Sequence, residues 1–437
     1  MKSFVKPFAY TMAAWLLGVS PLSFAHGNFR PDSSIENLED PGFKVHTHIR
    51  IVHVTQDEAS SRNSIKPSFR PFATGLPPYT GYLIETPASL ACIYGLTGLT
   101  AATTSGGCHP QQVTIRNPVV SAGSRAIAIV DACSYPTALA DLQKFSTQFG
   151  LAVPKTLSVV NANGTPNCTS SDGPSGWQLE ASLDLQWAHA MAPNATLYLV
   201  VAKNSSTTEL LKAVDRASNL VAAAGGGQVT MSWGSSEFFG QGQFDTHFQT
   251  TNVIYLASAG DSPGTSWPST SPYVIGVGGT TINRNSSTGQ FLSESVWANT
   301  GGGLSTIAAN TRPVYQNVVQ AKVGAQRGSP DVASVADPNN AAWVYNGSYN
   351  NQPGWYAVGG TSWAAPTIAG IMNAAGHFAA SSVAELAAIY GNIGGTGVAA
   401  NFRDITSGSC GLNKKYWGAT GWDFCTGVGT NWGYVGK

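Results

Sequence analysis

Two acidic residues four positions apart, Glu180 and Asp184, stand in a stretch with the apolar spacing of a helix. Positions four apart lie on one helical face, so the two carboxyl groups share a patch. Because like charges repel at that distance, one group should keep a proton well above its ordinary pKa. Far downstream, Ser362 stands where a Gly-Gly-Thr turn enters a predicted helix over residues 363–375. A carboxyl pair and an exposed serine predict a serine hydrolase whose general base is an acid residue.

The surroundings of Ser362 fit this prediction but do not prove it. Glycines allow a tight turn, and a helix N-terminus offers backbone N–H groups and a positive dipole end. Pro366 is tolerated only in the first turn of the helix that follows. Taken alone, the serine is also typical of an ordinary helix N-cap.

Asp261 is a further candidate because it follows a predicted buried strand over residues 253–259. Active residues of parallel sheets gather at the carboxyl ends of strands. The alternative for Asp261 is an ordinary turn aspartate.

Two other serine arrangements must be weighed. Gly260 to Gly264 matches G-x-S-x-G around Ser262, but that motif needs a helix directly after the serine, and Pro263 prevents one. A subtilisin-type triad of Asp131, His189 and Ser362 has the right order. His189 lies off the carboxylate face, however, so a plain helix histidine is favoured.

Strands alternate with helices around these residues, which predicts an α/β fold with a central parallel sheet and helices on both faces. The predicted strands are 126–130, 195–202, 228–233, 253–259 and 273–277, and the predicted helices are 139–149, one around Glu180, and 208–222.

Bulk composition limits the functions that remain. The 437 residues carry 11% charged side chains, no net charge and no basic run, so neither nucleic acid nor an anionic membrane surface is an expected partner. Residues 1–25 have basic Lys2 and Lys6, an apolar run and a small-residue cleavage site, which predicts a signal peptide rather than a membrane anchor. We therefore expect a secreted or periplasmic protein without a membrane partner after signal removal.

The six cysteines predict three disulfides in an exported chain. Spacing does not fix the pairing; pairing of neighbours would join 92 with 108, 133 with 168, and 410 with 425. No C-x-x-C is present, which argues against a thiolate zinc site.

Several ordered motifs together resemble the sedolisin family of serine-carboxyl peptidases. They are Gly360-Thr361-Ser362 with Pro366, the Glu180/Asp184 pair, Ser258-Ala259-Gly260-Asp261, Ser232-Trp233-Gly234, Gly301-Gly302-Gly303 and Ser329-Pro330-Asp331-Val332. The resemblance covers residues 83–437. It implies a subtilisin-like fold and a monomeric endopeptidase that cleaves proteins or peptides in acid.

The resemblance also implies roles for four residues. Ser362 would be the nucleophile, Glu180 the general base, and Asp184 the group that orients Glu180. Asp261 would line the oxyanion hole beside the Ser362 N–H. An ionised carboxylate would repel the oxyanion, so Asp261 must be protonated there. Since these protons are lost as pH rises, we expect an acidic optimum.

Neighbouring positions are implied to assist. Asp131 occupies the place of an acidic residue that bonds to the carboxyl pair in relatives, and Trp233 could join the same network. Ser232 and Gly234 resemble the edge that pairs with substrate backbone.

The C-terminal region resembles the family's calcium loop. Asp404 and Asp423, with the carbonyls of Ile405, Ala419 and Gly421, would bind a structural Ca²⁺. Relatives usually have glycine at the position of Ala419. A Gly-rich loop with two solvated aspartates is the alternative.

Residues 26–82 precede the matching region and look like a loose N-terminal extension or a short pro-region, whereas family members commonly carry a long prosegment. A runner-up function is the subtilisin-type protease, and a third is an inactive binding protein that keeps the fold.

Overall fold

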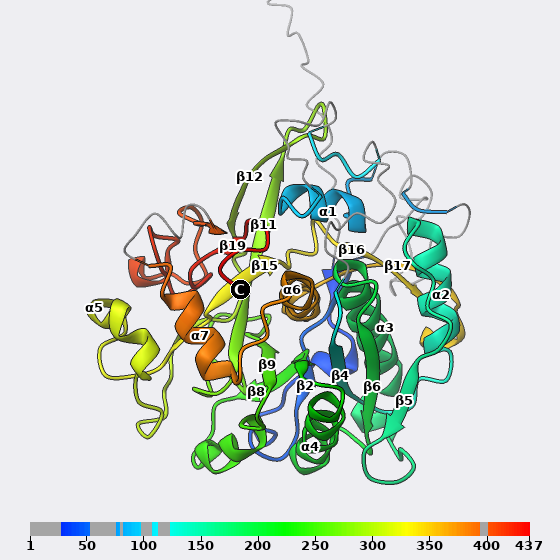
Figure 1. Cartoon of the computed structure of the whole chain (residues 1–437), viewed down its shortest axis with the longest axis horizontal. Coiled ribbons are helices and arrows are strands. Elements are labelled where there is room, and N and C mark those ends of the chain that lie inside the picture. Colours follow the sequence, from blue (N-terminus) through cyan, green and yellow to red (C-terminus); the bar gives the residue numbers. More distant parts are fainter. Residues whose placement is uncertain (1–27, 53–75, 79–81, 98–106, 112–122, 394–400) are drawn as a thin grey trace, which may run out of the picture.

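The computed structural model describes residues 28–52, 76–78, 82–97, 107–111, 123–393 and 401–437. The predicted signal peptide, residues 1–25, lies outside them. The described part is built on one large twisted sheet with helices on both faces (Figure 1). The α/β fold with a central, mostly parallel sheet is therefore confirmed.

The strands of the large sheet run in the order β18-β19-β15-β11-β9-β7-β4-β6-β5. Neighbours from β15 to β5 are parallel, whereas β18 and β12 pair antiparallel with β19 and β11. The bounds are β4 Ala126–Ala132, β5 Ser158–Asn161, β6 Thr196–Ala202, β7 Gly227–Met231, β9 Val253–Ser258, β11 Ile275–Arg284, β12 Phe291–Val296, β15 Val332–Val335, β18 Phe402–Arg403 and β19 Thr430–Asn431.

Side-chain alternation along β4 assigns the helices to the two faces. Ile127 and Ile129 join one core with residues of the helices on one face, and Ala128 and Val130 join another core on the opposite face. The first face carries α2 (Ala138–Phe149), α3 (Pro174–Met191), α6 (Thr361–Ala375) and α7 (Ser382–Tyr390), and the second carries α4 (Thr207–Ala223). Helices α3 and α6 pack side by side across the middle of the sheet (Figure 1). Asp131 continues the alternation of Ile127 and Ile129, so its side chain lies on the α3/α6 face.

Smaller elements surround this centre. They are α1 (Pro87–Ile93), α5 (Gln320–Val323), β8 (Trp233–Ser236), β10 (Ser266–Trp267), β13 (Gly303–Leu304), β14 (Gly328–Ser329), β16 (Ala342–Asn346) and β17 (Gly354–Gly359). Pairing of neighbouring cysteines is confirmed: Cys92–Cys108, Cys133–Cys168 and Cys410–Cys425 are disulfides.

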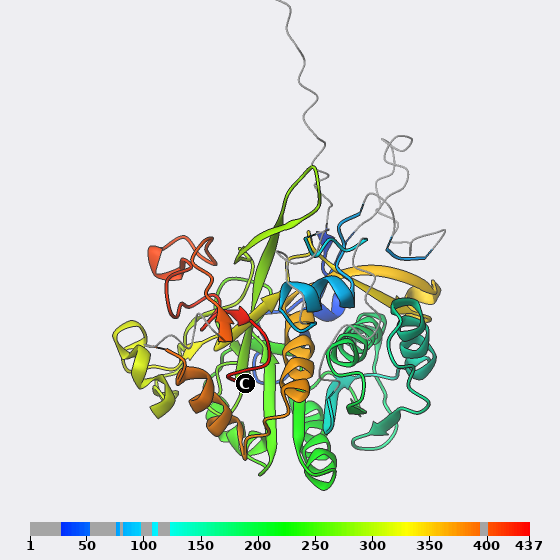
Figure 2. The same cartoon turned by 45° about the horizontal axis from the view of Figure 1, so that its top comes forward.

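The N-terminal segment 28–52 is packed against this unit, so the expectation of a loose segment is wrong for these residues. It forms β1 (Asn28–Phe29), β2 (His46–Thr47) and β3 (Arg50–Val52). β2 pairs antiparallel with β8, and β3 pairs antiparallel with β17. In Figure 2 this dark blue segment lies beside α6 and β17. The boundary near residue 82 stays a prediction.

Within the described ranges, no helix combines the length and the apolarity needed to cross a membrane.

Candidate active site

Helix α3 places Glu180 and Asp184 side by side in the interior. Gly173, in a left-handed conformation, precedes the helix, and Pro174 is its first residue. Proline is tolerated at this position because the first N–H of a helix has no partner within the helix. Glu180, Asp184 and Asp131 are all buried, with at most 1% of each residue exposed. Burial, followed by repulsion among these groups for Glu180 and Asp184, raises the pKa of all three well above the ordinary range.

The carboxyl groups of Glu180 and Asp131 accept no hydrogen bond from any described residue. A buried ionised carboxylate without donors costs several kcal/mol (on the order of 5) in free energy. Contact with Ser362 acts in the opposite direction on the pKa of Glu180, and contacts with Ser232 and Glu180 do so on the pKa of Asp184. The three acids therefore form one cluster that holds protons rather than three negative charges.

Ser232 lies beside Asp184, and its hydrogen bond lowers the pKa of Asp184 against the larger effect of burial. Its Oγ lies 2.8 Å from Asp184 Oδ1 and 3.2 Å from the carbonyl oxygen of Ser362. A hydroxyl has a single proton to donate. The hydroxyl of Ser232 donates to Asp184 at the shorter distance, and the carbonyl of Ser362 lies next to the same donor.

Ser362 is the second residue of α6. Its Oγ donates to the carbonyl oxygen of Ser232 at 3.1 Å. Helix α6 begins at Thr361, two residues before the predicted start. Pro366 therefore lies in the second turn, and the prediction that it lies in the first turn is wrong. Since proline has no N–H, the carbonyl of Ser362 lacks its partner four residues on. The hydroxyl of Ser232 lies where it can satisfy that carbonyl.

Asp261 lies beside the same helix start. Its Oδ1 accepts hydrogen bonds from the backbone N–H (2.7 Å) and hydroxyl (3.0 Å) of Thr361. Its Oδ2 is buried and has no hydrogen-bond partner among the described residues. Burial raises the pKa of Asp261 to about 6, although Arg50 and the Thr361 donors act against it. Below about pH 6 the carboxyl is therefore mostly neutral, and Arg50 Nε lies 3.6 Å from Oδ2.

Gly360 shows where Asp261 Oδ2 points. Its φ of +112° belongs to the region that favours glycine. A Cβ on Gly360 would lie 2.6 Å from Asp261 Oδ2 and 2.2 Å from the carbonyl oxygen of His48. Both oxygens thus approach one point beside the N-terminus of α6, and the Ser362 N–H donates to that same His48 carbonyl at 3.1 Å.

The stretch Ser232-Trp233-Gly234 lies along the opening of the site. Trp233 and Gly234 pair with Thr47 and His46 of β2. The indole of Trp233 donates to the carbonyl oxygen of Val130 at 2.8 Å, next to Asp131. The expectation that Trp233 bonds within the carboxyl network is therefore corrected: it holds the backbone of the strand that carries Asp131.

The residues of the two other serine arrangements have different partners. His189 is buried, and its Nε2 donates to the carbonyl of Ala152 at 2.7 Å, while burial lowers its pKa to about 4. Ser262 is exposed and accepts a hydrogen bond from Arg30. In the described part of the chain, no helix begins directly after Ser262, as the G-x-S-x-G motif would require.

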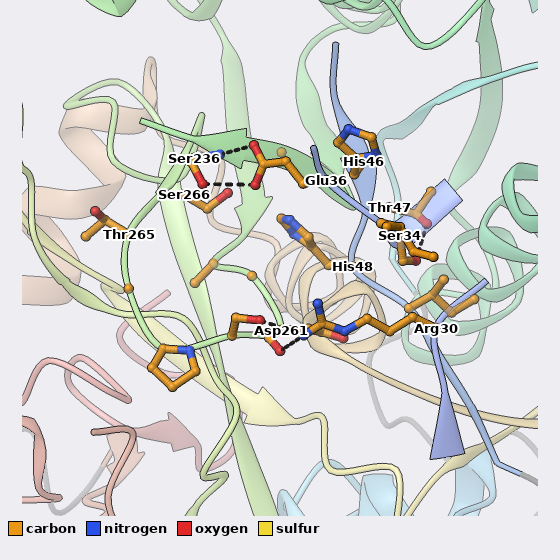
Figure 3. A pocket seen from close by; sticks show the side chains of 18 residues that line it. Arg30, Ser34, Glu36, His46, Thr47, His48, Ser236, Asp261, Thr265 and Ser266 are labelled. Atoms are coloured by element: carbon orange, nitrogen blue, oxygen red, sulfur yellow. Dashed lines mark hydrogen bonds between the residues drawn. The ribbon is translucent and has the colours of Figure 1, made fainter. Parts of the chain in front are cut away.

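A pocket of about 490 Å³ opens beside Asp261 (Figure 3). Residues of β2, of β8 and of the loop 259–266 line it. Figure 3 shows His48 inside this pocket, with Arg30 reaching toward Asp261. Sequence reasoning missed His48, Arg30 and Arg50 as parts of the site, because they are distant in sequence and no motif marks them.

The two carboxylates of the predicted calcium site lie over the same short loop. The N–H of Gly421 donates to Asp404 Oδ2 at 2.9 Å, and the N–H of Ala419 donates to Asp423 Oδ2 at 3.2 Å. Two carboxylates thus meet over one short loop. Burial raises the pKa of Asp423 to about 6 despite four hydrogen bonds to it. This donor set fits a hard cation.

Among the described residues, no cluster of three or more His, Cys, Asp or Glu side chains could hold a metal. The predicted loop has two carboxylates with backbone carbonyls, which is a different donor set. Lys322 donates to the carbonyls of Thr420 and Trp422 beside it, neither of which is a predicted ligand.

The fold and this grouping of a serine with buried carboxyl groups define the class: a protein of subtilisin-like fold with a serine-carboxyl site. The chain is 28% identical over 391 residues to sedolisin of Pseudomonas sp. (strain 101), covering 73% of this chain and 64% of that protein. It is also 28% identical over 323 residues to kumamolisin of Bacillus sp. (strain MN-32), covering 66% of this chain and 55% of that protein.

Comparison with solved structures agrees. Pseudomonas sedolisin, a serine-carboxyl proteinase complexed with two molecules of pseudo-iodotyrostatin, matches 80% of this chain and 95% of its own, with a TM-score of 0.61 and 24% identity. No family model matches the chain. These sequence and structure comparisons support the sedolisin family for this chain. It spans less than two thirds of the length of these two curated relatives.

Proposed function

We propose that the protein is an exported, acid-acting serine-carboxyl endopeptidase that hydrolyses peptide bonds in proteins or peptides. The observation that carries this proposal is the meeting of Ser362 with three buried carboxyl groups, whose pKa values burial raises, and with Asp261. The three disulfides support export to an oxidising compartment.

In the proposed reaction, Glu180 takes the proton of Ser362 as Oγ attacks the carbonyl carbon of the substrate, and then returns it to the leaving amine. Asp184 and Asp131 keep Glu180 in place and share its proton. The oxyanion receives the Ser362 N–H and the O–H of Asp261. Water then hydrolyses the ester by the same groups in reverse.

The proposed cation site has a structural role. Asp404 and Asp423, with the carbonyls of Ile405, Ala419 and Gly421, would hold Ca²⁺. When bound, the ion would supply positive charge to the buried Asp423 and fix the C-terminal loop that the Cys410–Cys425 disulfide also holds.

The decisive experiment compares Ser362→Ala, Glu180→Gln and His189→Ala with the wild type in the hydrolysis of denatured protein at pH 4 and pH 7. We expect Ser362→Ala and Glu180→Gln to lose roughly 10³- to 10⁶-fold in kcat/KM. His189→Ala should retain activity within about fivefold, since it would lose only a structural hydrogen bond. Full activity of Glu180→Gln together with inactive His189→Ala would instead establish a subtilisin-type triad.

A further inference from the structure

A second pocket, of about 350 Å³, lies apart from the pocket beside Asp261. Its walls come from the 3-10 helix η3 (Gln241–Phe248), from residues 271–273 and from residues 307–313. The two pockets share no lining residue among those described. We call the second one the Asp245 pocket, because Asp245 is the one charged side chain among its described lining residues.

The carboxyl group of Asp245 has only one of its oxygens bonded. Its Oδ1 accepts a hydrogen bond from Ser271 Oγ at 2.7 Å, and no hydrogen bond from a described residue reaches Oδ2. No Lys, Arg or His side chain in the described ranges forms an ion pair with Asp245. Burial raises the pKa of Asp245, and the hydrogen bond from Ser271 offsets only part of that rise. A cation that enters the pocket would therefore compensate a charge that the described side chains leave unpaired.

Hydrogen bonds hold the walls of the Asp245 pocket together. Asn310 Nδ2 donates to the carbonyl of Thr270 at 2.7 Å, and the hydroxyl of Tyr315 donates to the carbonyl of Pro272 at 3.0 Å. Gln241 Nε2 donates to Thr270 Oγ1 at 3.3 Å. Because these bonds tie the three wall segments to one another, the pocket is formed before any ligand enters it, and binding need not order these loops.

Glu237 connects the Asp245 pocket with the cleft. Its carboxylate accepts a hydrogen bond from Thr265, which lines the pocket beside Asp261, at 2.8 Å. It also accepts one from Gln241, which lines the Asp245 pocket, at 2.9 Å. Glu237 directly follows β8, the strand that is expected to pair with substrate backbone. The two pockets are therefore neighbours, and a protein substrate along β8 is large enough to contact both.

The chemistry of the Asp245 pocket suits a primary ammonium group on an aliphatic stem. Pro272, Ile307 and Pro313 supply apolar surface, along which the stem of a lysine packs while its charged head binds the carboxylate. Arginine pairs best with a carboxylate whose two oxygens are both free, because its guanidinium donates in a fork. Since Ser271 already donates to Oδ1, a single ammonium donor at Oδ2 is favoured.

We propose that the Asp245 pocket binds lysine side chains of protein substrates at a position away from the bond that is cut. The role of this binding in hydrolysis rests on the proposed function, whereas the binding itself does not. A lysine held in the pocket raises the effective concentration of the rest of the substrate chain beside the cleft. It should therefore lower KM for proteins without changing kcat, and it should not affect short peptides.

The first test measures binding of n-butylamine at pH 7 by NMR titration of the whole chain carrying Ser362→Ala, with and without Asp245→Asn. We expect saturable binding that Asp245→Asn weakens at least tenfold, because a charge-assisted hydrogen bond is lost. Asparagine keeps an acceptor for Ser271, so the variant should fold, and its Tm checks this. n-Butanol should not compete, and n-butylguanidine should bind more weakly than the amine.

Asp215→Asn is the matched control. It removes a carboxylate that pairs with His247 of the same 3-10 helix at 2.7 Å but does not line the Asp245 pocket. Its affinity for n-butylamine should stay within about twofold of the parent, since the surface ion pair contributes little.

The second test measures hydrolysis of a denatured lysine-rich protein and of its acetylated form at pH 6. Acetylation removes the charge of lysine. We expect acetylation to raise KM of the wild type about fivefold and to leave KM of Asp245→Asn unchanged. A short peptide without lysine should be hydrolysed with the same kcat/KM by both enzymes.

The outcomes separate this inference from the proposed function. If n-butylamine does not bind, or binds Asp245→Asn as tightly as the parent, the inference is wrong whatever the hydrolysis shows. If the amine binds but acetylation raises KM equally in both enzymes, the role in substrate binding is wrong. If the wild type hydrolyses no protein, the proposed function and that role both fail, and the titration alone decides whether the pocket binds an ammonium group.

Discussion

Two groups of carboxyl side chains in this molecule have opposite surroundings. Near Ser362, the carboxyl groups of Glu180 and Asp131 are buried without any hydrogen-bond donor from the described residues. In the C-terminal loop, Asp423 is also buried, but four donors from the backbone and from Thr426 surround its two oxygens. Burial raises the pKa in both groups, but Asp423 has four hydrogen-bond donors that act against this rise.

From this difference we expect the carboxyl groups near Ser362 to act in catalysis and those of the C-terminal loop to stabilise the fold. A group that holds protons among acids can exchange them with a substrate, and its properties must change with pH. A carboxylate bonded by fixed N–H groups holds its position, and it contributes to the fold when a cation completes it. Substitutions that remove charge should therefore act on catalysis in one region and on unfolding in the other.

After Ser362 and Glu180, the largest expected effect comes from Asp261. Asp261→Ala removes the proposed oxyanion donor and should lower kcat/KM roughly 10²- to 10³-fold at pH 4. Asp261→Asn keeps a donor at the position of Oδ2, so it should lose less. Because Asn does not titrate, the fall in rate that Asp261 causes above about pH 6 should move upward in that variant. Equal losses in both variants would show that Asp261 has no donor role.

Replacement of one aspartate by asparagine in each region, at Asp184 and at Asp423, tests the comparison directly. Asp184→Asn should reduce kcat roughly 10²-fold by misplacing Glu180. The raised pKa of Asp184 means that folding favours its protonated form, so stability is present at low pH and is lost as pH rises. Removing the titration should therefore make the variant more stable than wild type at pH 7 relative to pH 4, as measured by urea unfolding.

Asp423→Asn should lower the stability of the protein and leave its activity almost unchanged. It loses acceptors for backbone N–H groups, which costs about 1–3 kcal/mol of unfolding free energy. Its kcat/KM at 20 °C should stay within about threefold of wild type. A variant with normal thermal stability but strongly reduced activity would contradict the separation of the two regions.

Much of the fold was predictable from sequence. Runs such as Ala126–Val130 are continuous apolar strands, and this pattern is typical of a buried parallel sheet. The spacing of Glu180 and Asp184 predicted their common face, because helix geometry alone fixes it. The disulfides pair neighbours in sequence, which short loops permit.

The rest could not be predicted, because it depends on long-range packing. His48 and Ser362 are 314 residues apart, and no local pattern indicates that β2 and β3 pair across the site. The start of α6 at Thr361, with Pro366 in its second turn, is tolerated because Ser232 lies where it can bond the carbonyl that proline leaves free. That partner comes from another element of the fold.

Removal of Ca²⁺ should have a moderate effect. With the ion at 100 times its dissociation constant, binding stabilises the native state by about 2.7 kcal/mol. Addition of a chelator should then lower Tm by several degrees in the wild type and much less in Asp404→Asn. An unchanged Tm in the wild type would show that the C-terminal loop does not bind a stabilising Ca²⁺.

The smallest expected effect concerns Arg30. Its positive charge lowers the pKa of Asp261, so Arg30→Ala should raise that pKa. The fall in kcat/KM on the alkaline side should shift to slightly higher pH, by less than one unit. A shift to lower pH would contradict the assignment of that fall to Asp261.

The most direct test of the protonated site is the dependence of kcat/KM on pH for the wild type between pH 2 and 9, measured with a peptide whose charge does not change in that range. We predict a maximum in acid and a steep fall as pH rises through about 6 and above, where Asp261 and the carboxyl cluster lose their protons. A rate that climbs through neutral pH and stays constant in alkali would contradict the account.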